Sequence, residues 1–301
     1  MSNKIIEVKN LKKNYGNFNA VSNISFDVYE GNVFGFLGPN GAGKSTTIRI
    51  LLSLIRASSG YVKLFGKDIN TDRNFILSKI GCIVEKPDFY KYLSAEKNIE
   101  LFARISGLHV NKSKIHEMLE FVGLRGREKD KLSGFSHGMK QRLGFAQTLI
   151  HNPELIILDE PTTGLDPQGI IDIRNLILQL KNEKNKTVFL SSHILSEIEL
   201  IADRMVIVNK GETIAEGSIQ DLLNAQELIV AFTVDNVILA KQILQQNKIT
   251  DFTCHNNEIL LHISQSQSTE INKLFCSKGI NVFSIETKRK LEDYFLKLIN
   301  N

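Results

Sequence analysis

Gly38-Pro39-Asn40-Gly41-Ala42-Gly43-Lys44-Ser45 directly follows the apolar run Val33-Phe34-Gly35-Phe36-Leu37. In the spacing G-x-x-x-x-G-K-S, glycines let successive backbone N–H groups point inward and bind phosphate, and the positive end of the following helix reinforces them. Residues 46–52 continue at helical spacing, so the stretch lies between a predicted strand and a predicted helix. The sequence therefore predicts a nucleoside triphosphate as ligand. The alternative is a glycine-rich turn with a surface lysine.

Two side chains of this stretch have chemistry suited to a nucleotide. Lys44 is placed to reach the terminal phosphates and to act in catalysis, and Ser45 can offer its hydroxyl to Mg²⁺, which shares oxygen ligands with the nucleotide. The residues expected to contact the nucleotide here are Gly38, Pro39, Asn40, Gly41, Ala42, Gly43, Lys44, Ser45 and Thr46.

A second motif is Leu155-Ile156-Ile157-Leu158-Asp159-Glu160, an apolar strand that ends in two carboxylates. We expect Asp159 to hold Mg²⁺ and Glu160 to polarise the attacking water as a general base. Acidic residues after an apolar strand otherwise often cap the next helix. The phosphate-binding stretch in the same chain favours the catalytic interpretation.

Composition bounds the class of protein. The chain has 301 residues, 42% hydrophobic and 23% charged, which is typical of a soluble globular protein with more than one domain. The formal charge of +4 is spread without a basic block, so no nucleic-acid partner is predicted. Cys82, Cys254 and Cys276 lack metal-type spacing and are expected to be reduced, buried thiols. No signal peptide or membrane span is predicted, so work at a membrane requires another chain.

The chain divides by pattern into an α/β domain over residues 1–217 and a small α+β domain over 218–301. In the first, strands are predicted at 5–8, 20–28, 60–65, 155–158, 187–191 and 204–208, with a helix at 168–180. Helical patterns between about 86 and 150 predict an inserted helical subdomain, and a parallel sheet is the expected core. In the second, strands are predicted at 228–233, 249–253, 259–263 and 280–285, and helices at 240–246, 271–277 and 291–299.

Together these motifs resemble the ATP-binding cassette (ABC) of membrane transporters, over about residues 4–217. Phe135-Ser136-His137-Gly138-Met139 resembles the family signature L-S-G-G-Q. The resemblance implies that the Ser136 hydroxyl and the Gly138 backbone bind the γ-phosphate of ATP held by a partner cassette. A plain helix N-cap is the alternative for Ser136. ATP and Mg²⁺ are the implied cofactors, and the fold is a phosphate-loop ATPase cassette.

Three further residues fall in family order. Asp166, in Gly164-Leu165-Asp166, resembles the loop by which two cassettes contact each other, and His193 matches the histidine that bonds the γ-phosphate. Tyr15 corresponds to the aromatic residue that stacks on adenine. The alternatives are a histidine or a tyrosine with a purely structural role.

Three departures from the family pattern narrow the class of transported substrate that the resemblance implies. Glu85 stands where most cassettes carry glutamine, which implies a contact with the nucleotide; the alternative is a solvated loop charge. His137 and Met139 replace signature residues. Glu85 and the Ser-x-Gly-Met-Lys-Gln-Arg-Leu-Gly stretch resemble the bacitracin and lantibiotic-resistance branch of exporters. The resemblance implies a transmembrane permease, a second cassette that forms a homodimer with this chain, and a cytoplasmic location on the inner face of the membrane. The surface from Glu85 to Tyr92 is expected to contact the permease.

Two other classes compete with an exporter ATPase. Soluble cassette proteins of translation or DNA repair usually carry two cassettes or a long coiled coil, and neither pattern is present. A GTPase or small-molecule kinase could use the same phosphate loop. Its guanine-binding N-K-x-D motif is not matched, because Asn209-Lys210-Gly211-Glu212 lacks the aspartate.

Overall fold

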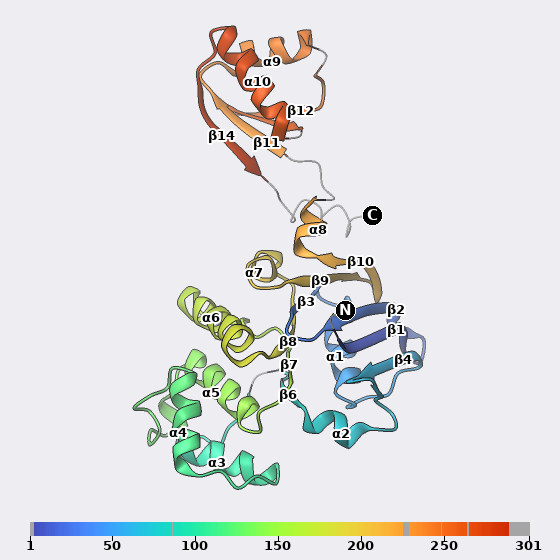
Figure 1. Cartoon of the computed structure of the whole chain (residues 1–301), viewed down its shortest axis with the longest axis vertical. Coiled ribbons are helices and arrows are strands. Elements are labelled where there is room, and N and C mark those ends of the chain that lie inside the picture. The colour runs from blue at the N-terminus through green and yellow to red at the C-terminus, as the bar shows by residue number, and fades with distance from the viewer. Residues whose placement is uncertain (1–2, 86, 225–228, 248, 264, 289–301) are drawn as a thin grey trace. The chain divides into compact units, whose positions relative to one another are not determined.

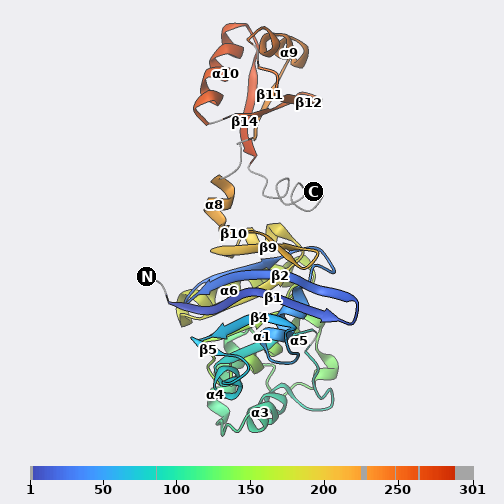
Figure 2. The ribbon, with the colours of Figure 1, turned by 90° about the vertical axis from the view of Figure 1, so that its right-hand side faces the viewer.

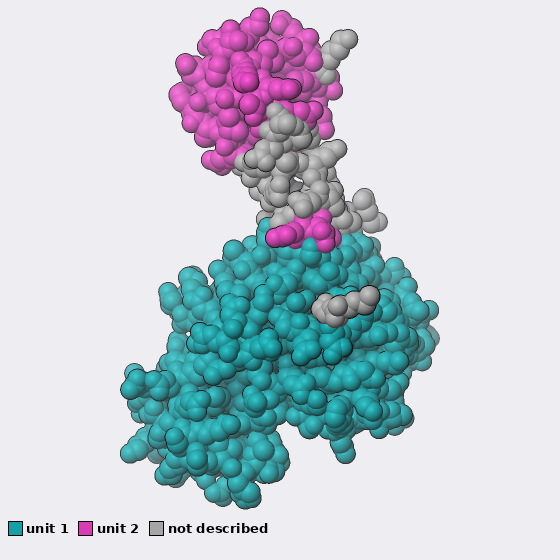
Figure 3. All heavy atoms as spheres, in the orientation of Figure 1, with its two compact units in different colours: residues 1–219 teal, residues 220–301 magenta. Residues whose placement is uncertain are grey.

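The computed structural model describes residues 3–85, 87–224, 229–247, 249–263 and 265–288. Contacts divide the chain into two compact units, Met1–Ile219 and Gln220–Asn301 (Figure 3). The sequence patterns had put a boundary at 217/218. The helix predicted at 291–299 lies outside the described residues.

Unit 1 is built on one extended, mixed sheet. Its strands run in the order β5-β4-β1-β2-β10-β9-β3-β8-β7-β6, and β1, β2 and β4 lie side by side in Figure 2. The bounds are β1 Lys4–Tyr15, β2 Phe18–Tyr29, β3 Val33–Leu37, β4 Ser59–Leu64, β5 Lys67–Asp68, β6 Ile80–Ile83, β7 Leu155–Leu158, β8 Thr187–Ser192, β9 Arg204–Asn209 and β10 Glu212–Ser218.

The predicted parallel core is confirmed for the strands that carry the site. β3 pairs in parallel with β8 and β9, and β7 pairs in parallel with β6 and β8. A wholly parallel sheet would be wrong, because β1 pairs antiparallel with both β2 and β4. Only two residues, Gly16 and Asn17, join β1 to β2, and so short a connection permits only a hairpin.

Helices cover this sheet and form the subdomain predicted between 86 and 150. Figure 1 shows α6 and α7 on one side of β3, β7 and β8 and α1 on the other, while α3, α4 and α5 pack together. The short helices α2 and α7 and the strands β5, β6 and β10 were not predicted. The bounds are α1 Lys44–Leu51, α2 Arg73–Ser78, α3 Ala95–Ile105, α4 Lys112–Phe121, α5 His137–Leu149, α6 Pro167–Lys184 and α7 Leu195–Glu199.

Helix ends follow ordinary capping chemistry. Ser94 caps α3 by accepting a hydrogen bond from the Lys97 backbone N–H at 3.3 Å. α6 begins with Pro167, whose fixed φ suits the first helical position, and ends at Asn185 in the left-handed conformation. The long helix behind the catalytic strands therefore starts and stops where its sequence dictates.

A cluster of aromatic side chains packs against β2, β3 and β8 of the unit 1 sheet. Phe26 of β2, Phe34 and Phe36 of β3 and Phe189 of β8 have ring centroids 5.4–5.9 Å apart, and all four are fully buried. Every residue of β3, β7 and β8 is buried, as expected of parallel strands covered on both faces. This packing fixes the carboxyl ends of the three strands, from which the site is built.

Unit 2 is an antiparallel sheet in the order β12-β13-β11-β14, with α9 and α10 packed on it. Phe232 and Phe275 meet edge to face in its core. The strand predicted at 249–253 is displaced, because β12 begins at Phe252. The bounds are α8 Ile219–Asn224, β11 Ile229–Val234, α9 Val237–Gln246, β12 Phe252–His255, β13 Glu258–His262, α10 Gln265–Ser277 and β14 Val282–Lys288.

The expectation of buried thiols is wrong. All three cysteines are free, Cys82 and Cys276 are exposed, and Cys254 is half-buried. Cys82 lies on β6, the edge strand of the unit 1 sheet, and lines a groove whose walls raise the pKa of its thiol by burial. None of the described helices is long and apolar enough to span a bilayer.

Candidate functional site

The stretch after β3 forms a pocket at the start of α1. The pocket has a volume of about 200 Å³ and opens to solvent. Most of its wall is the predicted phosphate-binding loop, and its lining residues are Phe18, Ala20, Asn40, Gly41, Gly43, Lys44, Ser45, Thr46 and Glu160.

Two glycines of the loop are required by its geometry. Gly41 has φ 81° and faces open space, so a bound group can approach its backbone. Gly43 has φ 96°, and a Cβ there would lie 2.8 Å from the Ala20 carbonyl oxygen. Both conformations are in the region that favours glycine. The loop therefore adopts this conformation without strain only with glycine at these positions.

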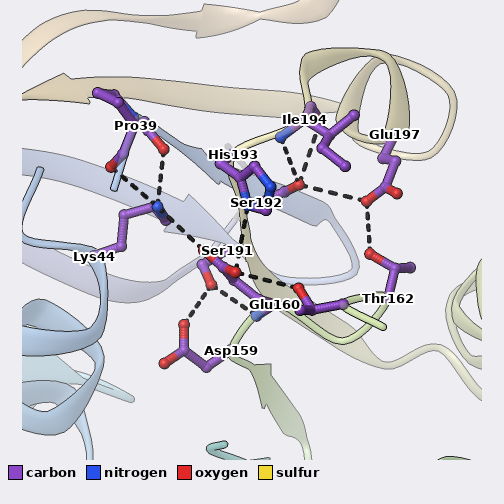
Figure 4. A network of polar contacts seen from close by, with 12 residues as sticks. Pro39, Lys44, Asp159, Glu160, Thr162, Ser191, Ser192, His193, Ile194 and Glu197 are labelled. Atoms are coloured by element: carbon purple, nitrogen blue, oxygen red, sulfur yellow. Dashed lines mark hydrogen bonds and ion pairs between the residues drawn. The ribbon is translucent and has the colours of Figure 1, made fainter. Parts of the chain in front are cut away.

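Lys44 is held under the loop and is only 5% exposed. Its Nζ donates to the carbonyl oxygens of Gly38 at 2.8 Å and Pro39 at 3.2 Å, and it lies 3.3 Å from Glu160 Oε1 (Figure 4). A lysine fixed by two carbonyls offers its remaining hydrogen to an anion. In this structure that anion is the Glu160 carboxylate.

Glu160 is the meeting point of the predicted catalytic side chains. Its Oε2 lies 3.3 Å from His193 Nδ1 and accepts a hydrogen bond from Thr163 Oγ1 at 3.2 Å (Figure 4). Partial burial raises the pKa of the Glu160 carboxyl, but Lys44 and His193 outweigh it and hold the pKa below its ordinary value. The Glu160 side chain is therefore an ionised carboxylate at neutral pH.

Ser191 links the Asp159 carboxylate to the backbone of Glu160. Its Oγ donates to Asp159 Oδ1 at 2.6 Å and accepts from the Glu160 N–H at 2.9 Å. Asp159 is 9% exposed, and its second oxygen can serve a cation directly or through water. Sequence reasoning missed Ser191, although its place at the carboxyl end of the neighbouring parallel strand β8 was a usable signal.

The signature residues Ser136 and Gly138, and Asp166 of the 164–166 loop, lie outside the lining of the pocket at Lys44. Ser136 is exposed and caps α5, accepting from the Met139 N–H at 3.2 Å, and Asp166 is exposed and caps α6, accepting from the Gly169 N–H at 3.0 Å. A Cβ on Gly138 would have Leu165 Cδ2 as its nearest neighbour, at 3.9 Å. The structure thus brings the signature and the 164–166 loop together, but neither lines the pocket at Lys44.

Two other predicted contacts are separated from the pocket lining. Tyr15 is 48% exposed, with Lys13 Nζ 4.8 Å from its ring centroid. Phe18, at the other side of the same hairpin turn, lines the pocket and was missed. Glu85 is exposed, has φ 66°, and forms a 2.6 Å ion pair with Arg49 Nη2.

Two buried or half-buried contacts after Glu160 also escaped the sequence analysis. Gln141 of α5 is 6% exposed and donates from Nε2 to the Pro161 carbonyl at 3.0 Å. Thr162 Oγ1 donates to Glu197 Oε2 of α7 at 2.7 Å. Gln141 belongs to the stretch that continues the signature, and Thr162 follows the paired carboxylates, but neither pattern indicates these contacts, which are made with the loop rather than with the pocket.

Known proteins that are similar to this chain are ATP-binding proteins of transporters. The ABC transporter family model matches residues 21–163. A bacitracin transport ATP-binding protein, BcrA of Bacillus licheniformis, is 44% identical over 98% of this chain and 97% of its own length. A lantibiotic transport ATP-binding protein, SrtF of Streptococcus pyogenes, is 42% identical over 74% of this chain and 95% of its own.

Solved structures show the same fold. The ATP-binding cassette MJ0796, described as a dimeric post-hydrolysis state bound to ADP and Pi, has a TM-score of 0.63 and 26% identity over 71% of this chain and 98% of its own. The phosphate loop, the paired carboxylates and the full-length relatives lead to one conclusion: the chain belongs to the ABC transporter family, as an ATP-binding subunit that hydrolyses ATP.

Proposed function

We propose that this chain powers a membrane exporter of peptide antibiotics, of the bacitracin or lantibiotic type. The observation that carries the ATPase part is the convergence of Lys44, Glu160 and His193 at the phosphate-loop pocket. The antibiotic class is supported by relatives named as bacitracin and lantibiotic transport proteins, which match the chain over nearly its full length or over its cassette.

In the proposed reaction, the loop's N–H groups and Lys44 bind the β- and γ-phosphates. Lys44 exchanges its contact with Glu160 for one with phosphate, which releases the carboxylate to accept a proton from the attacking water. His193, 3.3 Å from Glu160, would bond the γ-phosphate and hold the water between them. Phe18, whose ring lines the pocket, would contact the nucleotide together with Tyr15.

Mg²⁺ fits the donor set beside this pocket. Ser45 lines the pocket with a hydroxyl, and the adjacent strand ends in Asp159. Mg²⁺ is usually bound by one or two protein oxygens together with substrate phosphates, so these two side chains suffice. When bound, the ion neutralises charge that develops on the phosphates.

The exposed signature is the basis for proposing a head-to-tail pair of cassettes. Ser136 and Gly138 open α5, whose N-terminus is suited to an anion, yet the phosphates at Lys44 are bound on another part of the chain. A second copy would present its signature to the ATP bound at Lys44 of the first. The dimeric neighbour that holds ADP and Pi supports this arrangement.

Contact with a permease is proposed at the groove beside Glu85. This groove of about 450 Å³ lies among β6, α2, α3 and α5, and its walls are largely apolar. Tyr90 and Tyr92, 44% and 70% exposed, follow Glu85 along the chain. Closure of two cassettes would be passed to the permease here, which would hold this chain at the cytoplasmic face of the membrane.

Two experiments test the proposal. Affinity-tagged chain from native membranes should co-purify with a polytopic membrane protein and should not sediment with ribosomes. Cells that carry Glu160→Gln should lose resistance to bacitracin or a lantibiotic. Ribosome association without a membrane partner would favour a soluble ATPase of translation, the alternative that the relatives do not favour.

A further inference from the structure

The loop after Glu160 is fastened residue by residue. The Pro161 carbonyl accepts from Gln141 Nε2 at 3.0 Å, the Thr162 hydroxyl donates to Glu197 Oε2 at 2.7 Å, and the Thr163 hydroxyl donates to Glu160 itself. Of the first two partners, Gln141 comes from the helical subdomain and Glu197 from α7, beyond β8. The direction of the Glu160 side chain therefore depends on contacts outside its own strand.

Glu197 also reaches the segment that carries His193. Ser192 Oγ, one residue before His193, lies 3.4 Å from Glu197 Oε2 and accepts a hydrogen bond from the Ile194 N–H at 2.9 Å (Figure 4). A single carboxylate oxygen thus connects position 162, two residues after Glu160, with position 192. Glu197 is half-buried, where such a contact is better shielded from water than one on the open surface.

We propose that Glu197 is a positioning residue for ATP hydrolysis, which ties the loop after Glu160 to the segment before His193. Glu197 lines no part of the phosphate pocket, so it acts through the two side chains rather than on nucleotide. The inference rests on the proposed roles of Glu160 and His193 in the reaction.

Two features make this connection consequential. Glu160 has φ 46°, a conformation that a residue with a side chain adopts only when its surroundings impose it. Its carboxylate lies 3.3 Å from both Lys44 and His193 in this structure, and the proposed reaction requires it to stay beside His193 when Lys44 turns to phosphate. Without the Thr162–Glu197 contact, the loop can relax and the water-activating carboxylate moves away from the histidine.

The test compares Glu197→Ala, Thr162→Val and the double variant in steady-state and single-turnover ATPase assays. Each single change should lower kcat roughly ten- to hundredfold, as small misplacements of catalytic groups do, with KM and ATP affinity close to wild type. The double variant should be no slower than the slower single variant, because both remove the same contact. Glu197→Gln and Thr162→Ser, which keep an acceptor and a donor, should recover most of the rate.

Glu154→Ala is the matched control. It removes a carboxylate of unit 1 from a 2.7 Å ion pair with Lys79, away from the catalytic loop, and should leave kcat unchanged. Thermal unfolding of every variant separates misplacement from lost stability. A wild-type kcat for soluble, folded Glu197→Ala, or additive effects in the double variant, would overturn the proposal.

The result also separates this inference from the proposed site. If Glu160→Gln hydrolyses ATP at the wild-type rate, the assignment of Glu160 fails and Glu197 has nothing to position. If Glu160→Gln is slow while Glu197→Ala and Thr162→Val are fast, the site stands and only the positioning role is lost.

Discussion

The phosphate-loop pocket and the signature surface of this chain differ in whether the predicted site residues contact one another. At the pocket, Lys44, Glu160 and His193 come from three elements and meet within 3.3 Å contacts. At the signature surface, Ser136 and Asp166 are exposed, and their described hydrogen bonds are the caps of their own helices. A convergent site can be assigned within one chain, whereas the signature becomes a nucleotide site only if a second chain supplies the phosphate.

The largest effect is expected at the pocket, for Lys44→Ala. The buried ammonium has two fixed carbonyl partners and one direction left for an anion, so its loss removes a charge-assisted contact at the phosphates. Such a contact contributes about 1.5–3 kcal/mol, so ATP affinity should fall roughly ten- to hundredfold and hydrolysis more. Nucleotide titration measures this, with Lys79→Ala as the control lysine. Unchanged ATP affinity of Lys44→Ala would contradict the assignment of this pocket as the phosphate-binding site.

Glu160→Gln separates chemistry from binding at the same pocket. Loss of the general base should slow hydrolysis by about 10² to 10⁴. ATP binding should be kept or strengthened, because the carboxylate that now pairs with Lys44 no longer competes with phosphate. Single-turnover rates and an equilibrium titration on the same preparation provide both values. Wild-type hydrolysis would contradict the catalytic role.

Ser136→Arg tests the signature surface. With ATP and Mg²⁺, Glu160→Gln should elute as a dimer in size-exclusion chromatography, because trapped ATP joins two chains. Adding Ser136→Arg should return it to a monomer, since a bulky side chain would occupy the place of the shared phosphate. ATP affinity of the monomer should be nearly unchanged, as Ser136 lines no part of its own chain's pocket. A Glu160→Gln variant that stays monomeric would point to a dimer that requires its membrane subunits.

The smallest effect in vitro is expected for Glu85→Gln. Its ion pair with Arg49 is exposed, and such pairs contribute about 0–1 kcal/mol, so ATP affinity should hardly change. If the segment from Glu85 to Tyr92 transmits closure to a permease, antibiotic resistance in cells should nevertheless fall. Minimum inhibitory concentrations measure it, and full resistance of Glu85→Ala cells would separate this segment from transport.

Residues with a motif were predictable, and residues that hold the motifs in place were not. Lys44 and Glu160 stand out because each belongs to a short motif that follows an apolar strand and has a residue type that phosphate chemistry requires. Ser191 was missed although it ends a predicted strand, and Glu197 had no signal in the sequence, because hydrogen bonds between β8, α7 and the loop depend on which strands become neighbours.

Local sequence patterns also predicted the type of each element better than they predicted which strands pair. The apolar runs identified β3, β7 and β8, but the antiparallel pairing of β1 with β2 and β4 follows from connections that periodicity does not describe. Cys82 was expected to be buried because the three cysteines show no metal-type spacing and are odd in number. It is exposed because β6, only four residues long, forms the edge of the sheet.

Mixing two inactive variants tests the central claim most directly. Lys44→Ala has an intact signature, and Ser136→Arg has an intact phosphate loop. If each ATP is shared between Lys44 of one chain and Ser136 of another, a heterodimer of the two contains one complete site, and the mixture should recover ATPase activity that neither variant has alone. If the mixture stays as inactive as its components, although the two chains are shown to associate, the shared site is contradicted.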